Sequence, residues 1–403
     1  MRCNGMSWPN KPLGIVAEFI RGITYKPEEL VENFSQNSVV CMRTKNVQEI
    51  LDQGDLLSIP ERLIKRREQF LQEGDLLVSS ANSFNLVGKA CWVGKLNYAA
   101  TAGGFISILR PKVPELDRKF LFYWITSEPT QNSLRLCGRQ TTNISNLSFD
   151  RAEQLQIPLP PLPIQKKIAA VLEKADELRR KREEQIKRLD DLLQATFLDM
   201  FGDIFNDSKC IEKAEFGQFI RSIRYGTGSP PEFSQTGIPF IRATNVKERT
   251  IKSQGMAFIS AEEARKIEKC RVSEGDLIIV RSGANTGDCA RIPKAFDQAY
   301  GGYDLIIEID EPYSSFYNYF FSTPSARLVI DGLSRRAGQP HLNAEQVKTF
   351  PVLVPVDSDM QKFVKILIET EKMAESIVSR QKIHANLFNS LMQRAFKGEL
   401  DLK

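Results

Sequence analysis

The sequence predicts a mixed α+β protein with an internal repeat, in which two similar globular domains alternate with two long helices. Two observations carry this prediction. A long stretch with helical spacing of apolar residues occurs twice, and the segments ahead of both copies share motifs in the same order. Self-similarity at a fixed offset indicates a duplicated unit whose copies pack on one another.

The first long helix is predicted over residues 164–201. Apolar residues recur there at spacings of three and four, with charged residues on the other faces. This pattern indicates an amphipathic helix with a coiled-coil seam. Pro163 suits the start of a helix, and Gly202 suits its end. At 1.5 Å per residue, roughly 37 residues span about 55 Å, so we expect a strut between two domains.

A second long helix is predicted over residues 361–400. When Gln165 is set against Gln361, the two stretches align without a gap, and Phe201-Gly202 falls on Lys397-Gly398. Two equivalent amphipathic helices in one chain can bury their apolar seams on each other. The repetition therefore favours a packed pair over two solvated surface helices.

The segments ahead of the two helices match at an offset of about 200 residues, in unchanged order. The matched pairs are Met42–Val47 with Ile241–Val246, Glu73–Val78 with Glu274–Ile279, Gly103–Phe105 with Gly301–Tyr303, and Asn146–Ser148 with His341–Asn343. We therefore predict a tandem duplication. Its parts are a first domain over residues 1–160, a first helix over 161–203, a second domain over 204–356 and a second helix over 357–403.

Strand and turn signals dominate each globular domain. Glu-Gly-Asp followed by an apolar run is turn chemistry leading into a buried strand. Further strands are expected at Val39–Met42, Phe105–Leu109, Ile238–Ile241 and Leu305–Ile309. Short helices are expected at Asp117–Thr126, Ala261–Lys269 and Ser314–Phe321. Each domain is thus predicted to be α+β.

The composition is ordinary for a soluble globular protein, with 42% hydrophobic and 26% charged residues. A formal net charge of +5 permits a polyanionic partner without requiring one. Seven cysteines without a CxxC pair, and two histidines, argue against structural zinc and a disulfide framework and favour a reducing cytoplasm. No signal peptide is expected, and no run of about 18 apolar residues predicts a membrane span.

No catalytic or metal-binding constellation is predicted. Ser229–Glu232 is only loosely similar to the N-P-P-Y motif of amino-methyltransferases, and no glycine-rich loop for a methyl donor precedes it. Glu115, Asp117 and Lys119 are nuclease-like residue types at loose spacing, for which a solvated turn is the simpler interpretation. No phosphate-binding loop pattern is present. We expect a chain that binds rather than one that reacts.

Polar residues in turn-rich segments are the candidate binding residues, because Arg, Lys, Asn and Gln pair with base edges and Ser and Thr often contact phosphate. In the first half these are Arg43, Lys45, Asn46, Ser80, Asn82, Lys89, Arg139, Gln140, Thr141 and Asn143. In the second half they are Arg242, Thr244, Asn245, Arg281, Ser282, Asn285, Arg335, Arg336, Gln339 and His341. The alternative is that each is a turn former or a solvated charge. The recurring pair Arg43-x-x-Asn46 and Arg242-x-x-Asn245 also fits a shared internal scaffold.

The layout resembles the DNA specificity subunit of type I restriction-modification systems, over essentially the whole chain. The most specific motifs are Leu159–Ile168, which reads LPPLPIQKKI, the Glu-Gly-Asp-Leu strand starts, and Gly338–Asn343, which reads GQPHLN. The family usually has P-P-L-x-E-Q before its helix, and Ile164 stands here where glutamate is expected. The second copy of this motif, Val354–Gln361, departs further.

The resemblance implies two target recognition domains, each reading half of a bipartite double-stranded DNA site, with the two long helices packed antiparallel as a coiled-coil spacer. It also implies that two methyltransferase (modification) subunits, which use S-adenosylmethionine to methylate adenine, dock on the helices. Restriction and translocase subunits then join for ATP- and magnesium-dependent cleavage. No catalytic residue, metal or cofactor is implied for this chain. Two other hypotheses are a coiled-coil scaffold whose domains bind proteins, and a self-sufficient methyltransferase or nuclease.

Overall fold

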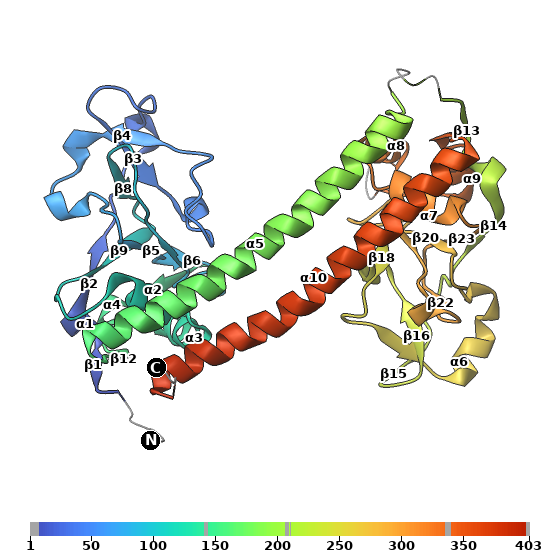
Figure 1. Ribbon diagram of the computed structural model, residues 1–403. Helices are drawn as coiled ribbons and strands as arrows, with labels where there is room; N and C mark the ends of the chain where they lie inside the picture. Colours follow the sequence, from blue (N-terminus) through green and yellow to red (C-terminus); the bar gives the residue numbers. More distant parts are fainter. Residues whose placement is uncertain (1–7, 141–143, 206–208, 210, 335–339, 400–403) are drawn as a thin grey trace. The chain divides into compact units, whose positions relative to one another are not determined.

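The computed structural model describes residues 8–140, 144–205, 209, 211–334 and 340–399 (Figure 1). The chain divides into two compact units, one made of residues 1–183 with 379–403 and the other of residues 184–378. Each unit holds one globular domain and a part of both long helices. These helices are α5 (Leu162–Phe201) and α10 (Asp357–Lys397).

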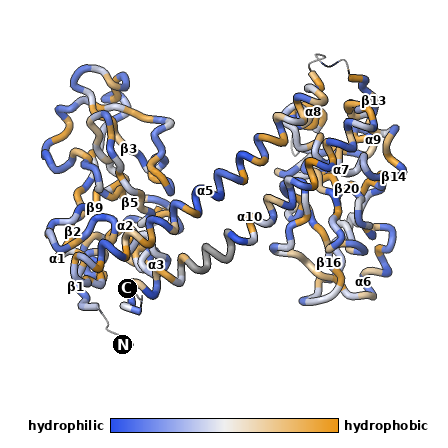
Figure 2. Tube along the Cα trace, in the orientation of Figure 1, coloured by the Kyte–Doolittle hydropathy of each residue, from blue (hydrophilic) through white to orange (hydrophobic). Residues whose placement is uncertain are grey.

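Both predicted long helices are confirmed, with shifted ends. Helix α5 begins at Leu162 rather than Ile164, and α10 begins at Asp357 rather than Gln361. Asp357 and Asp359 stand in the first turn of α10, where the helix dipole favours carboxylates, which explains the earlier start. Hydrophilic and hydrophobic residues alternate along α5, as the amphipathic pattern predicts (Figure 2). The predicted domain boundaries stay a prediction.

The first globular domain is built on a four-stranded antiparallel sheet in the order β2-β9-β5-β7. Its strands are β2 (Ala17–Arg21), β9 (Ile106–Pro111), β5 (Leu76–Ser79) and β7 (Ala90–Trp92). Two further sheets contain β4 (Ser58–Pro60), β3 (Ser38–Met42) and β8 (Ala100–Ala102), and β10 (Gly138–Gln140), β11 (Ser145–Leu147) and β6 (Ala81–Asn82). Strand β1 (Asn10–Pro12) pairs with β12 (Gln156–Pro158), just ahead of α5.

Helices α2 (Arg118–Thr126) and α3 (Glu128–Cys137) join this domain to the long helices of its unit. Phe120 and Leu121 of α2 share one core with Leu172 near the start of α5 and Ala395 near the end of α10. The ring centroids of Phe120 and Phe396 lie 5.3 Å apart. Because each large apolar side chain stabilises by about 1.5–3 kcal/mol when buried, this core holds the domain on the helices.

Gln165 fixes the start of α5 and gives the LPPLPIQKKI motif a structural role. Its buried side chain accepts a hydrogen bond from Asp117 N at 2.9 Å and donates to Glu115 O at 2.8 Å and Pro160 O at 2.7 Å. A buried amide with all these bonds made is costly to replace. Its repeat partner Gln361 is exposed, so the second copy of the motif lacks this anchor.

The second globular domain repeats the same sheet, in the order β14-β23-β20-β21. Its strands are β14 (Ile220–Tyr225), β23 (Leu305–Ile309), β20 (Leu277–Ile279) and β21 (Cys289–Arg291). A second sheet contains β15 (Phe233–Ser234), β19 (Ala257–Ile259), β16 (Ile238–Ile241) and β22 (Tyr300–Gly301). Smaller elements are β13 (Lys213–Glu215) paired with β24 (Pro351–Leu353), β17 (Val246–Lys247) paired with β18 (Thr250–Ile251), α6 (Ala261–Lys266) and α9 (Ala344–Lys348). The equal strand order in both domains confirms the internal repeat.

Helix α7 (Tyr313–Phe320), followed by α8 (Pro324–Ser334), packs the second domain against the helices of its unit. Phe197 near the end of α5 lies 5.3 Å from Phe363 near the start of α10, and Phe201 lies 5.1 Å from Phe316 of α7, between ring centroids. In each unit the beginning of one long helix therefore packs beside the end of the other, as antiparallel helices do.

The Glu-Gly-Asp turns have the same geometry in both domains. Gly74 and Gly275 have φ of +86° and +92°, a left-handed conformation that only glycine adopts without strain. The aspartate that follows is paired with an arginine on a neighbouring strand: Arg110 Nη2 lies 2.6 Å from Asp75 Oδ2, both groups being buried.

The predicted strands and short helices are confirmed within a few residues, and sequence reasoning missed α3 and α8. Asp117 is the N-cap of α2, accepting a hydrogen bond from Phe120 N at 2.9 Å. Among the described residues, no helix combines the length and the apolar run that crossing a lipid bilayer requires.

Candidate nucleic-acid interface

Asn46 and Asn245 form an internal scaffold in their turns, and their role as DNA contacts stays a prediction. Both side chains are fully buried. Asn46 accepts from Arg43 N at 2.8 Å and donates to Asp52 O at 2.9 Å, and Asn245 repeats both kinds of bond at 3.1 Å, with Arg242 N and Lys252 O. These amides are thus used inside the turn. Of the two interpretations of the recurring pair, the scaffold describes the asparagines.

The arginines of the same turns are held from within the domain. Arg43 Nη2 lies 3.0 Å from Asp55 Oδ1, and Lys45 pairs with the same carboxylate. Arg242 donates to Gly255 O at 2.5 Å and lies over a phenylalanine ring. Surface ion pairs contribute little to stability, so these cations can exchange their partners. Lys45 and Thr244 are exposed, and a role for these four residues in DNA contact stays a prediction.

The first polar edge, which we define as Ser80, Asn82, Arg139 and Asn146, is assembled by the β10-β11-β6 sheet and the end of β5. Arg139 stands opposite Asn146, and Asn82 stands opposite Ser145. The main chain of Ser80 is fixed on both sides, since its N donates to Phe105 O at 2.9 Å and its O accepts from Leu147 N at 2.8 Å. The structure thus brings Ser80, Asn82 and Arg139 onto neighbouring segments, with Arg139 and Asn146 on the exposed face of the sheet and Asn82 on the face of the buried Ser145.

The second polar edge, defined as Arg281, Ser282 and His341, occupies the equivalent place in the second domain. Arg281 O accepts from Leu342 N at 2.8 Å, as Ser80 O accepts from Leu147 N. Ser282 and His341 form an isolated β-bridge, and Arg281 Nη2 lies 3.0 Å from His341 Nε2. Because a guanidinium can only donate, Arg281 Nη2 is the donor and His341 Nε2 the acceptor of this contact.

A buried carboxyl lies directly behind the second polar edge. Asp304 is 2% exposed, and its Oδ1 accepts from Arg281 N at 3.3 Å. Burial raises the pKa of Asp304 to about 6, although the N–H and the charge of Arg281 oppose the rise. The Oδ2 atom has no hydrogen-bond partner among the described residues. The equivalent position in the first domain is Ile106, so this titratable group belongs to one domain only.

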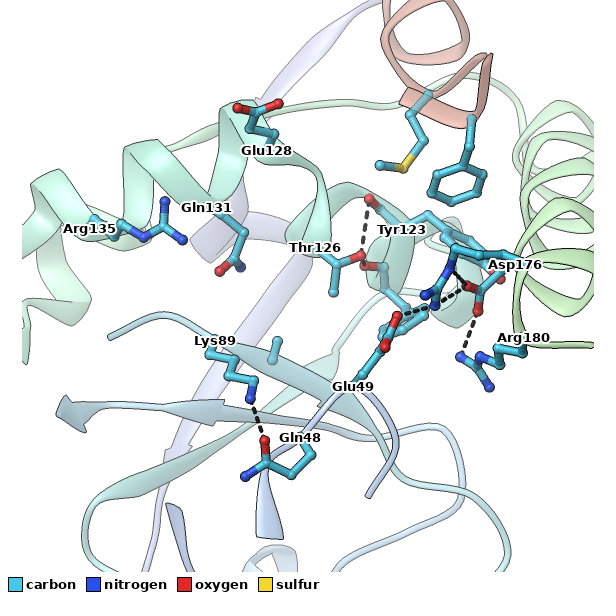
Figure 3. Close-up of a pocket in the computed structure, with 15 residues that line it drawn as sticks. Gln48, Glu49, Lys89, Tyr123, Thr126, Glu128, Gln131, Arg135, Asp176 and Arg180 are labelled. Carbon is cyan, nitrogen blue, oxygen red and sulfur yellow. Dashed lines mark hydrogen bonds and ion pairs between the residues drawn. The ribbon is translucent and has the colours of Figure 1, made fainter. Parts of the chain in front are cut away.

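Lys89 lies beside a cavity of about 420 Å³ in the first unit (Figure 3). Its Nζ donates to Gln48 Oε1 at 2.7 Å, and Glu49 on the same turn pairs with Arg179 of α5. The ionised groups lining the cavity are Lys89, Arg135, Arg179, Arg180, Glu49, Glu128 and Asp176. These charges nearly balance, so the cavity offers little attraction to a polyanion.

Several predicted residues lie outside the described part of the chain. They are Thr141, Asn143, Arg335, Arg336, Gln339 and the side chain of Gln140.

Exposed aromatic residues at both edges were missed by sequence reasoning. Phe105 is 64% exposed, and Tyr225 and Tyr303 are 42% and 48% exposed. A signal is present in the sequence, because Gly103–Phe105 and Gly301–Tyr303 match in the repeat, but a matched motif does not show that its ring is exposed. Exposed aromatic rings beside polar residues are typical of binding surfaces.

The nucleophilic and nuclease-like residues have structural roles where they are described. Burial raises the pKa of the Cys41 and Cys91 thiols to about 12, which suppresses the reactive thiolate. Asp117 is used as a helix cap, and Lys119 pairs with Glu173 at 2.9 Å. Among the described residues, no three His, Cys, Asp or Glu side chains gather as a metal site.

Comparisons with known proteins agree with the arrangement of two domains. The family model described as type I restriction modification DNA specificity domain matches residues 7–188 and 226–384. The EcoKI specificity subunit of Escherichia coli K12 is 26% identical, and the StySPI specificity subunit of Salmonella potsdam is 24% identical. Both alignments cover 98% of this chain and 89% of the relative.

The fold is also similar to solved structures. The S subunit of a type I restriction-modification system from M. genitalium has a TM-score of 0.60 at 14% identity, with 98% of both chains covered. A chain from a type I R-M system studied for its complex assembly has a TM-score of 0.53 at 16% identity, with 98% of both chains covered. Because its family model matches both halves of the sequence, this chain belongs to the type I restriction modification DNA specificity family.

Proposed function

We propose that this chain is the non-catalytic DNA-recognition subunit of a type I restriction-modification complex, in which each globular domain reads one half of a bipartite duplex site. The observation that carries the proposal is the pair of polar edges. They hold equivalent places in two copies of one fold, yet Ser80 in the first corresponds to Arg281 in the second, and Asn146 corresponds to His341. Equal scaffolds with different side chains suit two different half-sites.

The long helices suit the role of a spacer. Linking two weak reading domains turns the second binding event into an intramolecular one, which raises affinity through effective concentration. Continuous helices such as α5 and α10 also fix the number of base pairs between the half-sites. Phosphate contacts from Lys and Arg then supply affinity that falls with salt, and base contacts supply specificity.

Apolar residues on the outer faces of the helices support docking of modification subunits. In the second unit, Ile366, Ile368, Met373 and Val378 of α10 are 37–59% exposed. A cavity of about 360 Å³ lies beside them, lined by Pro312, Val364 and Ile368 together with charged residues. Exposed apolar stripes on a helix are a common docking surface for a partner helix.

In this proposal the chemistry stays in the partner subunits. S-adenosylmethionine, ATP and magnesium would be bound there, and this chain would determine which DNA sequence the complex recognises. The described cysteines are buried free thiols, which supports a reducing cytoplasm as the compartment.

The test is selection of bound duplexes from a random DNA library by the full chain together with its modification subunit. The expected result is a bipartite consensus with a fixed gap, and an affinity that falls steeply between about 50 and 200 mM salt. The scaffold hypothesis predicts no consensus and no salt-sensitive retention of DNA. Binding of S-adenosylmethionine by the isolated chain would instead favour a self-sufficient methyltransferase.

A further inference from the structure

The geometry points to Arg281, which packs against the rings of Tyr225 and Tyr303, as the residue that reads a guanine in one half-site. This inference rests on the proposed function, since it names what one domain recognises. We call these three residues the arginine sandwich.

The arginine sandwich is defined by two short contacts of the Arg281 guanidinium, one with each tyrosine ring. Arg281 Cζ lies 4.6 Å from the ring centroid of Tyr225 and 4.2 Å from that of Tyr303. A guanidinium over an aromatic face is attracted by the ring quadrupole, and the contact is strongest where water is excluded. With two rings packed against it, the guanidinium has its N–H donors left to present to a ligand.

Each member of the sandwich is fixed by the surrounding fold. Tyr225 ends β14, and its hydroxyl accepts a hydrogen bond from Ala344 N at 3.0 Å. Arg281 follows β20, with its main-chain N bonded to Asp304 Oδ1 and its O bonded to Leu342 N. Strand β23 lies between β14 and β20, so the three segments meet at one end of the sheet. The side chain is thus positioned before any ligand arrives, which reduces the entropy lost on binding.

The free donors of Arg281 match an acceptor pair. One Nη2 hydrogen is directed to His341 Nε2 at 3.0 Å, Nε is buried without a partner, and among the described residues no hydrogen bond holds Nη1. A guanidinium edge binds two acceptors in one plane, as in guanine O6 with N7 or in two phosphate oxygens. Packing against two aromatic rings favours the flat edge of a base over a tetrahedral, strongly hydrated phosphate.

The first domain has no such sandwich among its described residues. Ser80 stands at the place of Arg281, and Arg21 stands at the place of Tyr225 and lies 5.2 Å from the ring of Phe149. The exposed ring of Phe105 remains as the counterpart of Tyr303. Guanine reading through Arg281 is therefore confined to the half-site of the second domain.

The experiment compares DNA selected by the full chain with its modification subunit against DNA selected by variants. Arg281→Ala and Arg281→Lys should both lose the preference for one G·C pair in one half-site, with about tenfold to hundredfold weaker binding to the original consensus. Tyr303→Phe keeps the ring and should retain the preference, whereas Tyr303→Leu should lose it. Arg221→Ala is the matched control, because Arg221 lies on β14, the strand that also carries Tyr225, and its 61% exposed side chain pairs with Asp310. It should leave the consensus unchanged.

A second arm keeps the protein unchanged. Replacing the selected guanine by 7-deazaguanine removes the N7 acceptor, so it should weaken binding of the original chain by a similar factor and have no further effect on Arg281→Ala. This arm stays decisive if a variant fails to fold. A methylphosphonate at the neighbouring phosphate should have a small effect.

Three results would overturn the inference. Arg281→Ala that weakens all duplexes equally, with a salt slope lower by about one, would make Arg281 a phosphate contact. A preference lost in the other half-site, or an unchanged response to 7-deazaguanine, would also refute it. These outcomes leave a bipartite consensus in place. The absence of any consensus for the unchanged chain would refute the proposed function itself.

Discussion

Arg249 of the second domain lies with its Nη1 3.2 Å from Asp190 Oδ1 on helix α5. Its Nε lies 3.7 Å from Glu371 Oε1 on α10, and its guanidinium lies 5.1 Å from the ring centroid of Tyr319. The hairpin β17-β18 is thus tied to both long helices of its unit. In the first unit the corresponding turn carries Glu49, which pairs with Arg179 of α5, so a turn residue is again paired with a long helix, there with the charges reversed.

We predict that Arg249→Ala destabilises the second unit by about 1–2 kcal/mol, because it leaves the Glu371 carboxylate without its cation. Burial already raises the pKa of Glu371, and Arg249 opposes that rise. Arg249→Glu should cost more, since it places a third carboxylate beside Asp190 and Glu371. All three tryptophans lie in the first unit. Circular dichroism should therefore show a lower unfolding midpoint while tryptophan fluorescence stays unchanged.

The Glu49–Arg179 pair of the first unit suggests a second substitution that should restore stability to the Arg249→Glu variant. Combining Arg249→Glu with Asp190→Arg restores an ion pair with the order of charges found at Glu49 and Arg179. The double variant should recover part of the lost stability, and the coupling energy follows from a double-mutant cycle. A coupling energy of zero would mean that the Arg249 contact with Asp190 does not stabilise the unit.

A second prediction concerns the buried pair Arg110 and Asp75. Their side chains are 9% and 0% exposed. Arg110→Ala should destabilise the first unit by about 3–5 kcal/mol, because it strands a buried carboxylate. Because all three tryptophans lie in this unit, their fluorescence during denaturant unfolding should show a lower midpoint for the variant than for the unchanged chain.

The repeat supplies the matched control for this prediction. In the second unit Asp276, the counterpart of Asp75, pairs instead with Arg224 of β14 at 3.4 Å, with the arginine side chain 30% exposed, because Glu308 stands at the place of Arg110. Arg224→Ala should therefore cost clearly less, because the 3.4 Å contact is longer and the arginine that is removed is already partly solvated. If both variants lost the same free energy of unfolding, burial would not determine how much the ion pair stabilises its unit.

A third prediction uses the buried carboxyl of Asp304. Its pKa is about 6 in the folded chain against an ordinary value of 3.8, so its contribution to stability is present below about pH 4 and is lost as pH rises through 6. Asp304→Asn is neutral and keeps an oxygen for Arg281 N. It should stabilise the second unit by about 1–3 kcal/mol at pH 8 and by nothing at pH 4. Thermal unfolding followed by circular dichroism across this pH range measures the difference.

Asp297→Asn is a control that should change stability at pH 8 in the opposite direction from Asp304→Asn. A hydrogen bond from Glu274 N lowers the pKa of Asp297, so neutralising it removes a favourable charge at pH 8. If Asp304→Asn gave the same gain at pH 4 and pH 8, the gain would come from packing and not from the titration.

Local pattern predicted the long helices and the repeat because both are periodic in the sequence. The start of α10 shifted because its first turn uses acidic residues that the apolar pattern does not register. Asn46 shows why binding residues are harder to predict from the sequence. An asparagine can read a base or support a turn, and only its burial in the fold distinguishes the two roles. The arginine sandwich joins three segments far apart in the chain, so no spacing rule reveals it.

The last prediction concerns the helices as a spacer. Four residues add about 6 Å to a helix and turn it by about 40° beyond a full turn, which nearly preserves its apolar face. Inserting four alanines after Arg182 of α5 and four after Val378, its repeat partner in α10, should lengthen both helices equally. The gap between half-sites should then grow by about two base pairs, at a rise of about 3.4 Å each. Library selection with the full chain and its modification subunit reads the gap directly.

Insertion into α5 alone gives the contrasting result, because helices of unequal length cannot keep the packing of both units. We expect this variant to lose binding to the bipartite site. Four alanines after Asn97, in an exposed turn of the first domain, control for the insertion itself and should leave the gap unchanged. An unaltered gap in the double insertion would contradict the spacer, because separation of the half-sites would then be set by something other than helix length.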